Sequence, residues 1–103
     1  MNTQISIIQE IEKIKAKNIT TIDIMDEEYL ADQMIICTGS SSTHVKAIAK
    51  NIILNFKKTE NKIIGIEGME TGEWVLIDFS NVILHIMQQK TREYYNLEKL
   101  WSK

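Results

Sequence analysis

The sequence predicts an α/β (α+β) domain, in which a two-layer mixed β-sheet is flanked by helices. Three observations support this fold class. Segments with helical and with strand character alternate along the chain, a β-hairpin follows them, and the length of 103 residues suits one domain. We therefore expect residues 1–103 to form a single domain with a modest hydrophobic core.

The N-terminal segment is predicted to be a helix followed by a strand. Isoleucines recur at helical spacing within residues 3–17, and Asn18 is a plausible C-terminal cap for that helix. A strand is expected over residues 19–25, and a short turn of helix over residues 27–31.

A buried strand and a long helix are expected in the middle of the chain. The strand covers residues 34–38 and ends at Gly39. Ser41 or Ser42 can cap the next helix by accepting a backbone N–H bond, and that helix runs to about Lys58. Its apolar stripe is predicted to consist of Val45, Ile48, Ala49, Ile52 and Phe56.

The hairpin is the most informative segment. It follows a strand over residues 62–67 and a turn over residues 68–72, and its two apolar runs flank the turn-forming pair Ser80-Asn81. If the turn is symmetric about that pair, side chains alternate between two faces of the sheet. One face is then wholly apolar and faces the core: Val75, Ile77, Phe79, Val82, Leu84 and Ile86.

The second face of the hairpin mixes residue types: Trp74, Leu76, Asp78, Ile83, His85 and Met87. Such a mixture suits a surface that is covered part of the time, by a helix or by another molecule. A final helix is expected to hold Tyr94, Tyr95 and residues 97–101, mostly packed on the sheet. Asp78 and His85 are expected near one another on this face, so the Asp78 carboxylate could pair with His85 and orient its imidazole.

Composition restricts the class of partner and the compartment. The net charge is −2 and the sequence pI about 5.7, whereas proteins that dock on phosphate backbones usually present a basic face. Little direct RNA contact is therefore expected.

No apolar run approaches 18 residues, so no membrane span is predicted, and the N-terminus is not a signal peptide. The single cysteine, Cys37, suggests a buried, reduced thiol in the cytoplasm.

Catalytic chemistry is not indicated by the residues. Gly39-Ser40 could hold phosphate, but Asp23 and Asp26 would point to opposite faces of a strand and Asp78 stands alone. The serines lack a nucleophile-elbow motif, and Cys37 and the two histidines have no metal-ligand spacing. We expect no catalytic residues, no metal and no cofactor.

The hairpin and the C-terminal segment resemble the ribosomal silencing factor family, the Iojap-like proteins. The similarity spans roughly residues 20–101. It is carried by three segments: Thr38-Gly39-Ser40-Ser41-Ser42-Thr43-His44, Glu73-Trp74-Val75-Leu76-Ile77-Asp78 and Arg92-Glu93-Tyr94-Tyr95-Asn96-Leu97-Glu98-Lys99-Leu100-Trp101. The resemblance implies a nucleotidyltransferase-like fold and binding to the large ribosomal subunit through its ribosomal protein number fourteen. It also implies steric blocking of subunit joining under nutrient limitation, and homodimers when free.

Tryptophan in a strand is more often core than interface, but Trp74 shares its face with a carboxylate and an imidazole, which a dry core tolerates poorly. With the resemblance included, the expected partner-binding residues are Glu73, Trp74, Leu76, Asp78, His85 and Arg92. Two alternatives remain: a nucleotidyltransferase or nucleotide-binding enzyme, and a large-subunit assembly factor.

Overall fold

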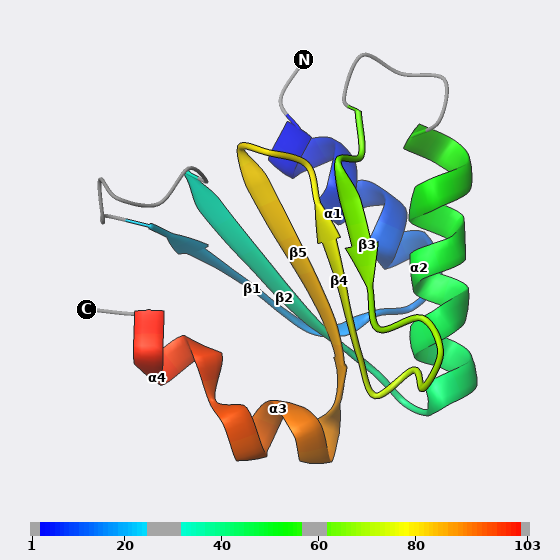
Figure 1. Cartoon of the computed structure of the whole chain (residues 1–103), viewed down its shortest axis with the longest axis vertical. Helices are drawn as coiled ribbons and strands as arrows, with labels where there is room; N and C mark the ends of the chain where they lie inside the picture. Colours follow the sequence, from blue (N-terminus) through cyan, green and yellow to red (C-terminus); the bar gives the residue numbers. More distant parts are fainter. Residues whose placement is uncertain (1–2, 25–31, 57–61, 102–103) are drawn as a thin grey trace.

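The computed structural model describes residues 3–24, 32–56 and 62–101, apart from the side chain of Trp101. A five-stranded mixed sheet has the strand order β1-β2-β5-β4-β3, with β2 and β5 parallel and the other neighbouring pairs antiparallel. Figure 1 shows the arrangement of the elements. In chain order these are α1 Thr3–Lys13, β1 Lys17–Asp23, β2 Gln33–Gly39, α2 Ser42–Phe56, β3 Gly65–Glu67, β4 Trp74–Asp78, β5 Val82–Gln88, α3 Gln89–Tyr95 and α4 Leu97–Trp101.

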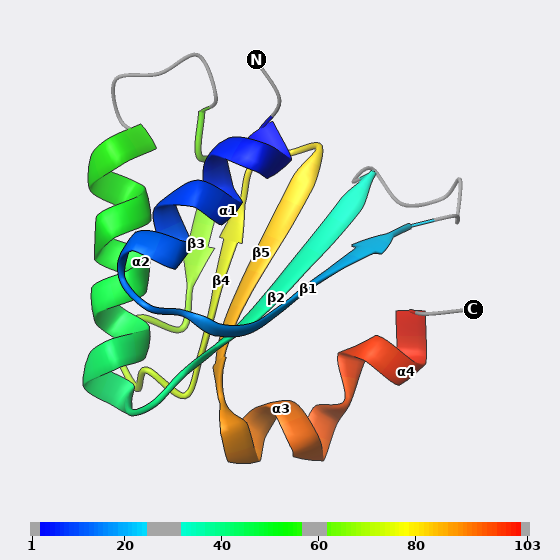
Figure 2. The same cartoon turned by 180° about the vertical axis from the view of Figure 1, so that it is seen from behind.

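Helices α1 and α2 cover one face of the sheet and enclose the main hydrophobic core, as Figure 2 shows from their side. The predicted stripe of α2 and the predicted core face of the hairpin both lie in this core and are buried. The fold class predicted from the sequence is therefore confirmed, because the apolar periodicities of helix and hairpin meet in one interior.

The other face of the sheet is only partly covered. Leu97 of α4 packs against Ile22, Met34, Ile36 and Met87, so the C-terminal helices close a second, smaller cluster near β1 and β2. Figure 1 looks onto this face, and no helix passes in front of the upper part of β5 and β4. None of the described helices is long and apolar enough to cross a bilayer.

Several element boundaries differ from the sequence prediction. Helix α1 ends at Lys13, and the left-handed residue after it is Lys15 (φ 62°), not Asn18 as expected. Asn18 is left-handed too (φ 50°), but it lies inside β1, where the register with β2 shifts and a bulge forms. The third strand is shorter than predicted, and the short helical turn expected over residues 27–31 lies outside the described residues.

The C-terminal helix is two helices. Asn96 adopts a left-handed conformation (φ 46°) and its backbone N–H donates to the carbonyl of Arg92, which ends α3 before α4 begins. Tyr94 on α3 (82% exposed) and Leu100 on α4 (66%) do not pack on the sheet, contrary to the expectation, although Leu97 does.

Candidate functional site

The mixed face predicted from the hairpin has the expected register. The cross-strand pairs on it are Trp74 with Met87, Leu76 with His85, and Asp78 with Ile83. We call the surface formed by Trp74, Leu76, Asp78, Ile83 and His85 the open face; among the described residues, the C-terminal helices contact it only at Trp74, through Tyr95 and the cluster around Leu97. All five residues of the open face are half-buried except His85, which is buried. The open face thus brings four of the six predicted site residues together.

Trp74 lies at one end of the open face and is held in one orientation by its neighbours. Its indole N–H donates a hydrogen bond to Nδ1 of His85 at 2.9 Å. Its ring also lies 4.9 Å, centroid to centroid, from the ring of Tyr95 on α3. The indole is therefore preorganised while part of its surface still meets solvent, which lowers the entropy cost of using it in a contact.

His85 is a neutral structural partner of Trp74. Because Nδ1 accepts the indole hydrogen bond, the proton of the neutral ring is assigned to Nε2, which has no hydrogen-bond partner among the described residues. Burial lowers the pKa of His85 from 6.5 to about 4. The ring is therefore uncharged at neutral pH.

The expected pairing of Asp78 with His85 is wrong. Nδ1 of His85 is occupied by Trp74, and Oδ1 of Asp78 instead accepts the backbone N–H of Ser80 at 2.7 Å. Ser80 has a positive φ of 76° at the hairpin turn, and the carboxylate stabilises that conformation by an Asx-type bond. Asp78 thus shapes the turn and also borders the open face.

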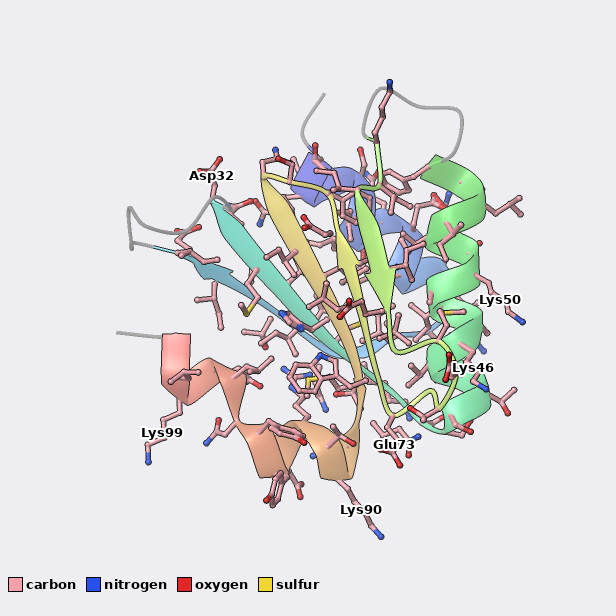
Figure 3. The ribbon with its side chains drawn as sticks, in the orientation of Figure 1. Asp32, Lys46, Lys50, Glu73, Lys90 and Lys99 are labelled. Carbon is pink, nitrogen blue, oxygen red and sulfur yellow. The ribbon has the colours of Figure 1, made fainter. Side chains whose placement is uncertain are left out.

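The two residues predicted at the rim have different environments. Glu73 is exposed immediately before β4, and Figure 3 shows it at the same end of the sheet as Lys90 of α3. Arg92 is buried (8% exposed), which differs from the expected rim position.

The guanidinium of Arg92 is used within the fold. Nε donates to Oε1 of Glu98 at 2.7 Å, and the other two nitrogens donate to the carbonyl of Asn18 and to the hydroxyls of Thr38 and Thr20. These bonds fasten α3 and α4 to β1 and β2. A contact between Arg92 and a partner stays a prediction, which its burial does not favour.

The glycine-serine segment after β2 has a structural explanation. A Cβ added at Gly39 would lie 2.7 Å from Cγ2 of Val45, so the glycine permits α2 to approach the strand. Ser41 caps α2, because its hydroxyl accepts the backbone N–H of His44 at 3.1 Å. Ser41 is one of the two serines predicted to cap this helix. The imidazole of His44 bonds to the Ser40 backbone N–H and to the Ile14 carbonyl, each at 2.8 Å.

Cys37 is buried, as expected, and its burial raises the thiol pKa to about 12, so the sulfur is not an activated nucleophile. No group of three or more His, Cys, Asp or Glu side chains suited to a metal ion occurs within residues 3–24, 32–56 and 62–101. These observations describe the part of the chain that the structure covers.

Sequence reasoning missed the contact between Tyr95 and Trp74. Both tyrosines lie on one helix, as expected, but only Tyr95 (52% exposed) reaches the sheet, where its ring lies against Trp74, and Tyr94 packs edge-on against Tyr95. No local signal predicts this contact, because it joins two residues that are distant in the sequence; Asn96, a residue type that tolerates the left-handed conformation, signals only the end of α3.

Comparisons with known proteins agree with one another. A family model described as "Ribosomal silencing factor during starvation" matches residues 2–103. The chain is 40% identical over 96 residues to a protein of Haemophilus influenzae named ribosomal silencing factor RsfS, covering 93% of this chain and 94% of that protein. A mouse protein named "Mitochondrial assembly of ribosomal large subunit protein 1" is 31% identical over 90 residues, which are 84% of this chain and 40% of that protein.

A solved structure gives the same picture. The crystal structure of a protein from Chromobacterium violaceum superposes with a TM-score of 0.89 at 40% sequence identity, covering 98% of this chain and 87% of the other. A second, from Bacillus halodurans, has a TM-score of 0.81 at 33% identity and covers 97% of this chain and 95% of the other.

Proposed function

Because the chain belongs to the ribosomal silencing factor family, we propose that it binds the large ribosomal subunit and represses translation when nutrients are limited. The contact on the ribosome is large-subunit ribosomal protein number fourteen. A bound copy occupies the surface that the small subunit needs, so the two subunits do not join. The mechanism is steric and requires no covalent chemistry.

The observation that carries this proposal is the open face. It is a half-buried sheet surface with one preorganised aromatic residue, Trp74, and aliphatic neighbours Leu76 and Ile83. Tryptophan is among the residue types most enriched at interface hot spots, and a few such residues carry most of the binding energy of an interface of standard size. Of the six site residues predicted from the sequence, Glu73, Trp74, Leu76, Asp78 and His85 lie on this face or at its end, whereas Arg92 is buried elsewhere in the fold.

We expect Trp74→Ala to abolish co-sedimentation with large subunits. Losing a central aromatic anchor typically costs about 2–4 kcal/mol, on the order of a hundredfold in affinity. Circular dichroism checks that the variant is folded. Trp74→Phe is the companion variant, because it keeps a smaller aromatic ring and removes the pyrrole part of the indole, including the N–H that donates to His85.

The matched control for this experiment is Leu54→Ala. Leu54 is an apolar residue that is 69% exposed on α2, which covers the opposite face of the sheet. Its truncation should leave sedimentation unchanged. Undiminished sedimentation of a folded Trp74→Ala variant would remove Trp74 from the site, and unfolding of that variant would assign the indole to the core.

A large-subunit assembly factor is the second candidate. It is favoured by one observation, the name of the mouse relative, which links that protein to assembly of the mitochondrial large ribosomal subunit. Both candidates use the same contact surface and differ in timing. Binding to purified mature subunits supports silencing, and binding restricted to precursor particles supports assembly.

We also propose that the protein works in the cytoplasm and forms homodimers when it is free. A dimer that buried the open face would compete with the ribosome for it. Size-exclusion chromatography with and without large subunits tests the competition.

A nucleotidyltransferase activity would instead appear as turnover of labelled nucleotides with magnesium, lost on Asp78→Ala.

A further inference from the structure

The open face has a carboxylate border along β3 and β4. Glu67 of β3 lies opposite Leu76, and Asp78 lies opposite Gly65. Since directly opposed residues in an antiparallel pair share a face, Glu67 points to the same side of the sheet as Leu76 and Asp78. Glu67 and Asp78 are then diagonal neighbours, roughly 7–8 Å apart between Cα atoms.

Neither carboxylate forms an ion pair with another described residue. Within the described residues the ion pairs are Lys13 with Glu10 and Arg92 with Glu98, and neither involves Glu67 or Asp78. Figure 3 shows Lys46 and Lys50 on α2 and Lys90 and Lys99 on the C-terminal helices. Adjacent like charges are mildly destabilising in a sheet, so placing the second charge, that of Glu67, beside Asp78 does not stabilise the isolated fold, although Asp78 itself stabilises the turn through the Ser80 N–H.

The border changes what the open face can recognise. Next to it lie the half-buried aliphatic side chains of Leu76 and Ile83, which offer an apolar contact. One oxygen of Asp78 is engaged by the Ser80 N–H, while Glu67 is exposed at the edge of the sheet. The surface therefore combines an aromatic residue at one end and an aliphatic centre with a negative edge, which complements a positive group on a partner.

We propose that Glu67, together with Asp78, receives a lysine or arginine side chain of the protein to which the open face binds. This inference rests on the proposed function and deepens it, because it states which chemistry the partner presents beside the indole contact. The occupant is a basic segment of a protein. Ribosomal RNA is disfavoured here, because its phosphates would be repelled by the two carboxylates.

The test compares two charge reversals that change the net charge equally. Glu67→Lys reverses the border, and Glu12→Lys reverses an exposed carboxylate on α1, the helix on the opposite face. Glu67→Gln removes the charge without introducing repulsion. Each protein is titrated with purified large subunits at low and at high salt, and each is checked for its unfolding midpoint.

We expect Glu67→Lys to weaken binding by about tenfold or more at low salt, because border charges act through local electrostatic attraction, and to lose much of that effect at high salt. Glu67→Gln should show part of the loss, and Glu12→Lys should stay within about twofold of wild type.

Three other outcomes separate the inference from the proposed function. If the wild type fails to bind large subunits, both are overturned. If Trp74→Ala abolishes binding while Glu67→Lys matches Glu12→Lys, the proposed function stands and the inference is overturned. If Glu67→Lys binds more tightly and with a steeper salt dependence, the border faces phosphate, which overturns a basic protein occupant.

Discussion

At the scale of single residues, the hydrogen bond between Trp74 and His85 couples a binding residue to a titratable one. The imidazole is 4% exposed and its pKa is lowered by burial to about 4, whereas an unfolded chain has the usual histidine value near 6.5. Protonation of Nδ1 would occupy the lone pair that accepts the indole N–H, so the hydrogen bond that orients Trp74 would be lost. The open face therefore requires the neutral ring.

The consequence is a defined pH dependence of stability. Between pH 6.5 and pH 4 the unfolded chain binds a proton at this position and the folded chain does not, so the free energy of unfolding falls as the pH falls. We expect His85 to contribute a loss on the order of 3 kcal/mol by pH 4, and no slope above about pH 7. Urea unfolding of the wild type and of His85→Gln across this range measures it. Parallel slopes in the two proteins would contradict the assignment.

At the scale of elements, the turn between β3 and β4 determines where Trp74 begins its strand. Gly68 has φ +90°, and a Cβ there would lie 1.9 Å from the carbonyl oxygen of Trp74. The N–H of Gly72 donates to the carbonyl of Gly68 and closes the turn. Only glycine combines this backbone conformation with such a close approach.

We expect Gly68→Ala to lower the free energy of unfolding by more than about 2 kcal/mol, because alanine disfavours the positive φ and its methyl group would collide with the backbone of β4. Gly65→Ala is the matched control, since a Cβ at Gly65 meets nothing within 4 Å. It should change stability by less than about 1 kcal/mol. Equal effects of the two substitutions in chemical denaturation would show that the turn does not need glycine.

Elements were predictable from the sequence where their local signals agreed. The pair Ser80-Asn81 and the two-residue alternation fixed the register of the hairpin, and with it the shared face of Trp74, Leu76, Asp78 and His85. Helix ends were harder, because Lys15 adopts a left-handed conformation without being a residue type that signals it.

Tertiary contacts were beyond the reach of local patterns. Arg92 is separated by 74 residues from Asn18, whose carbonyl it binds, so no spacing rule could reveal that its charge is used inside the fold. The same holds for the choice of His85 between Asp78 and Trp74, both of which lie on its face. Side-chain pairing on a sheet depends on rotamers and burial as well as on register.

At the scale of the whole molecule, the fold completes one face of its sheet and leaves part of the other open. Helices α1 and α2 enclose the main core, whereas the open face contributes to the interior through buried His85 and through Trp74, which packs against the smaller cluster. The C-terminal helices, fastened by Arg92, support Trp74 through Tyr95 without covering the rest of the face. A small domain can thus offer a rigid surface to a partner.

A protein that blocks subunit joining sterically blocks one large subunit for each bound copy, so the stoichiometry of inhibition tests the mechanism of the whole molecule. Protein incubated with purified large subunits before small subunits are added should reduce subunit joining in proportion to the number of large subunits occupied, without added nucleotide. The reason is that a steric block ends when the bound copy leaves. Sucrose-gradient profiles over a range of protein-to-subunit ratios measure the effect, and a folded Trp74→Ala variant should leave joining unchanged. Full inhibition at a small fraction of one copy per subunit would instead require turnover, and the steric mechanism would have to be abandoned.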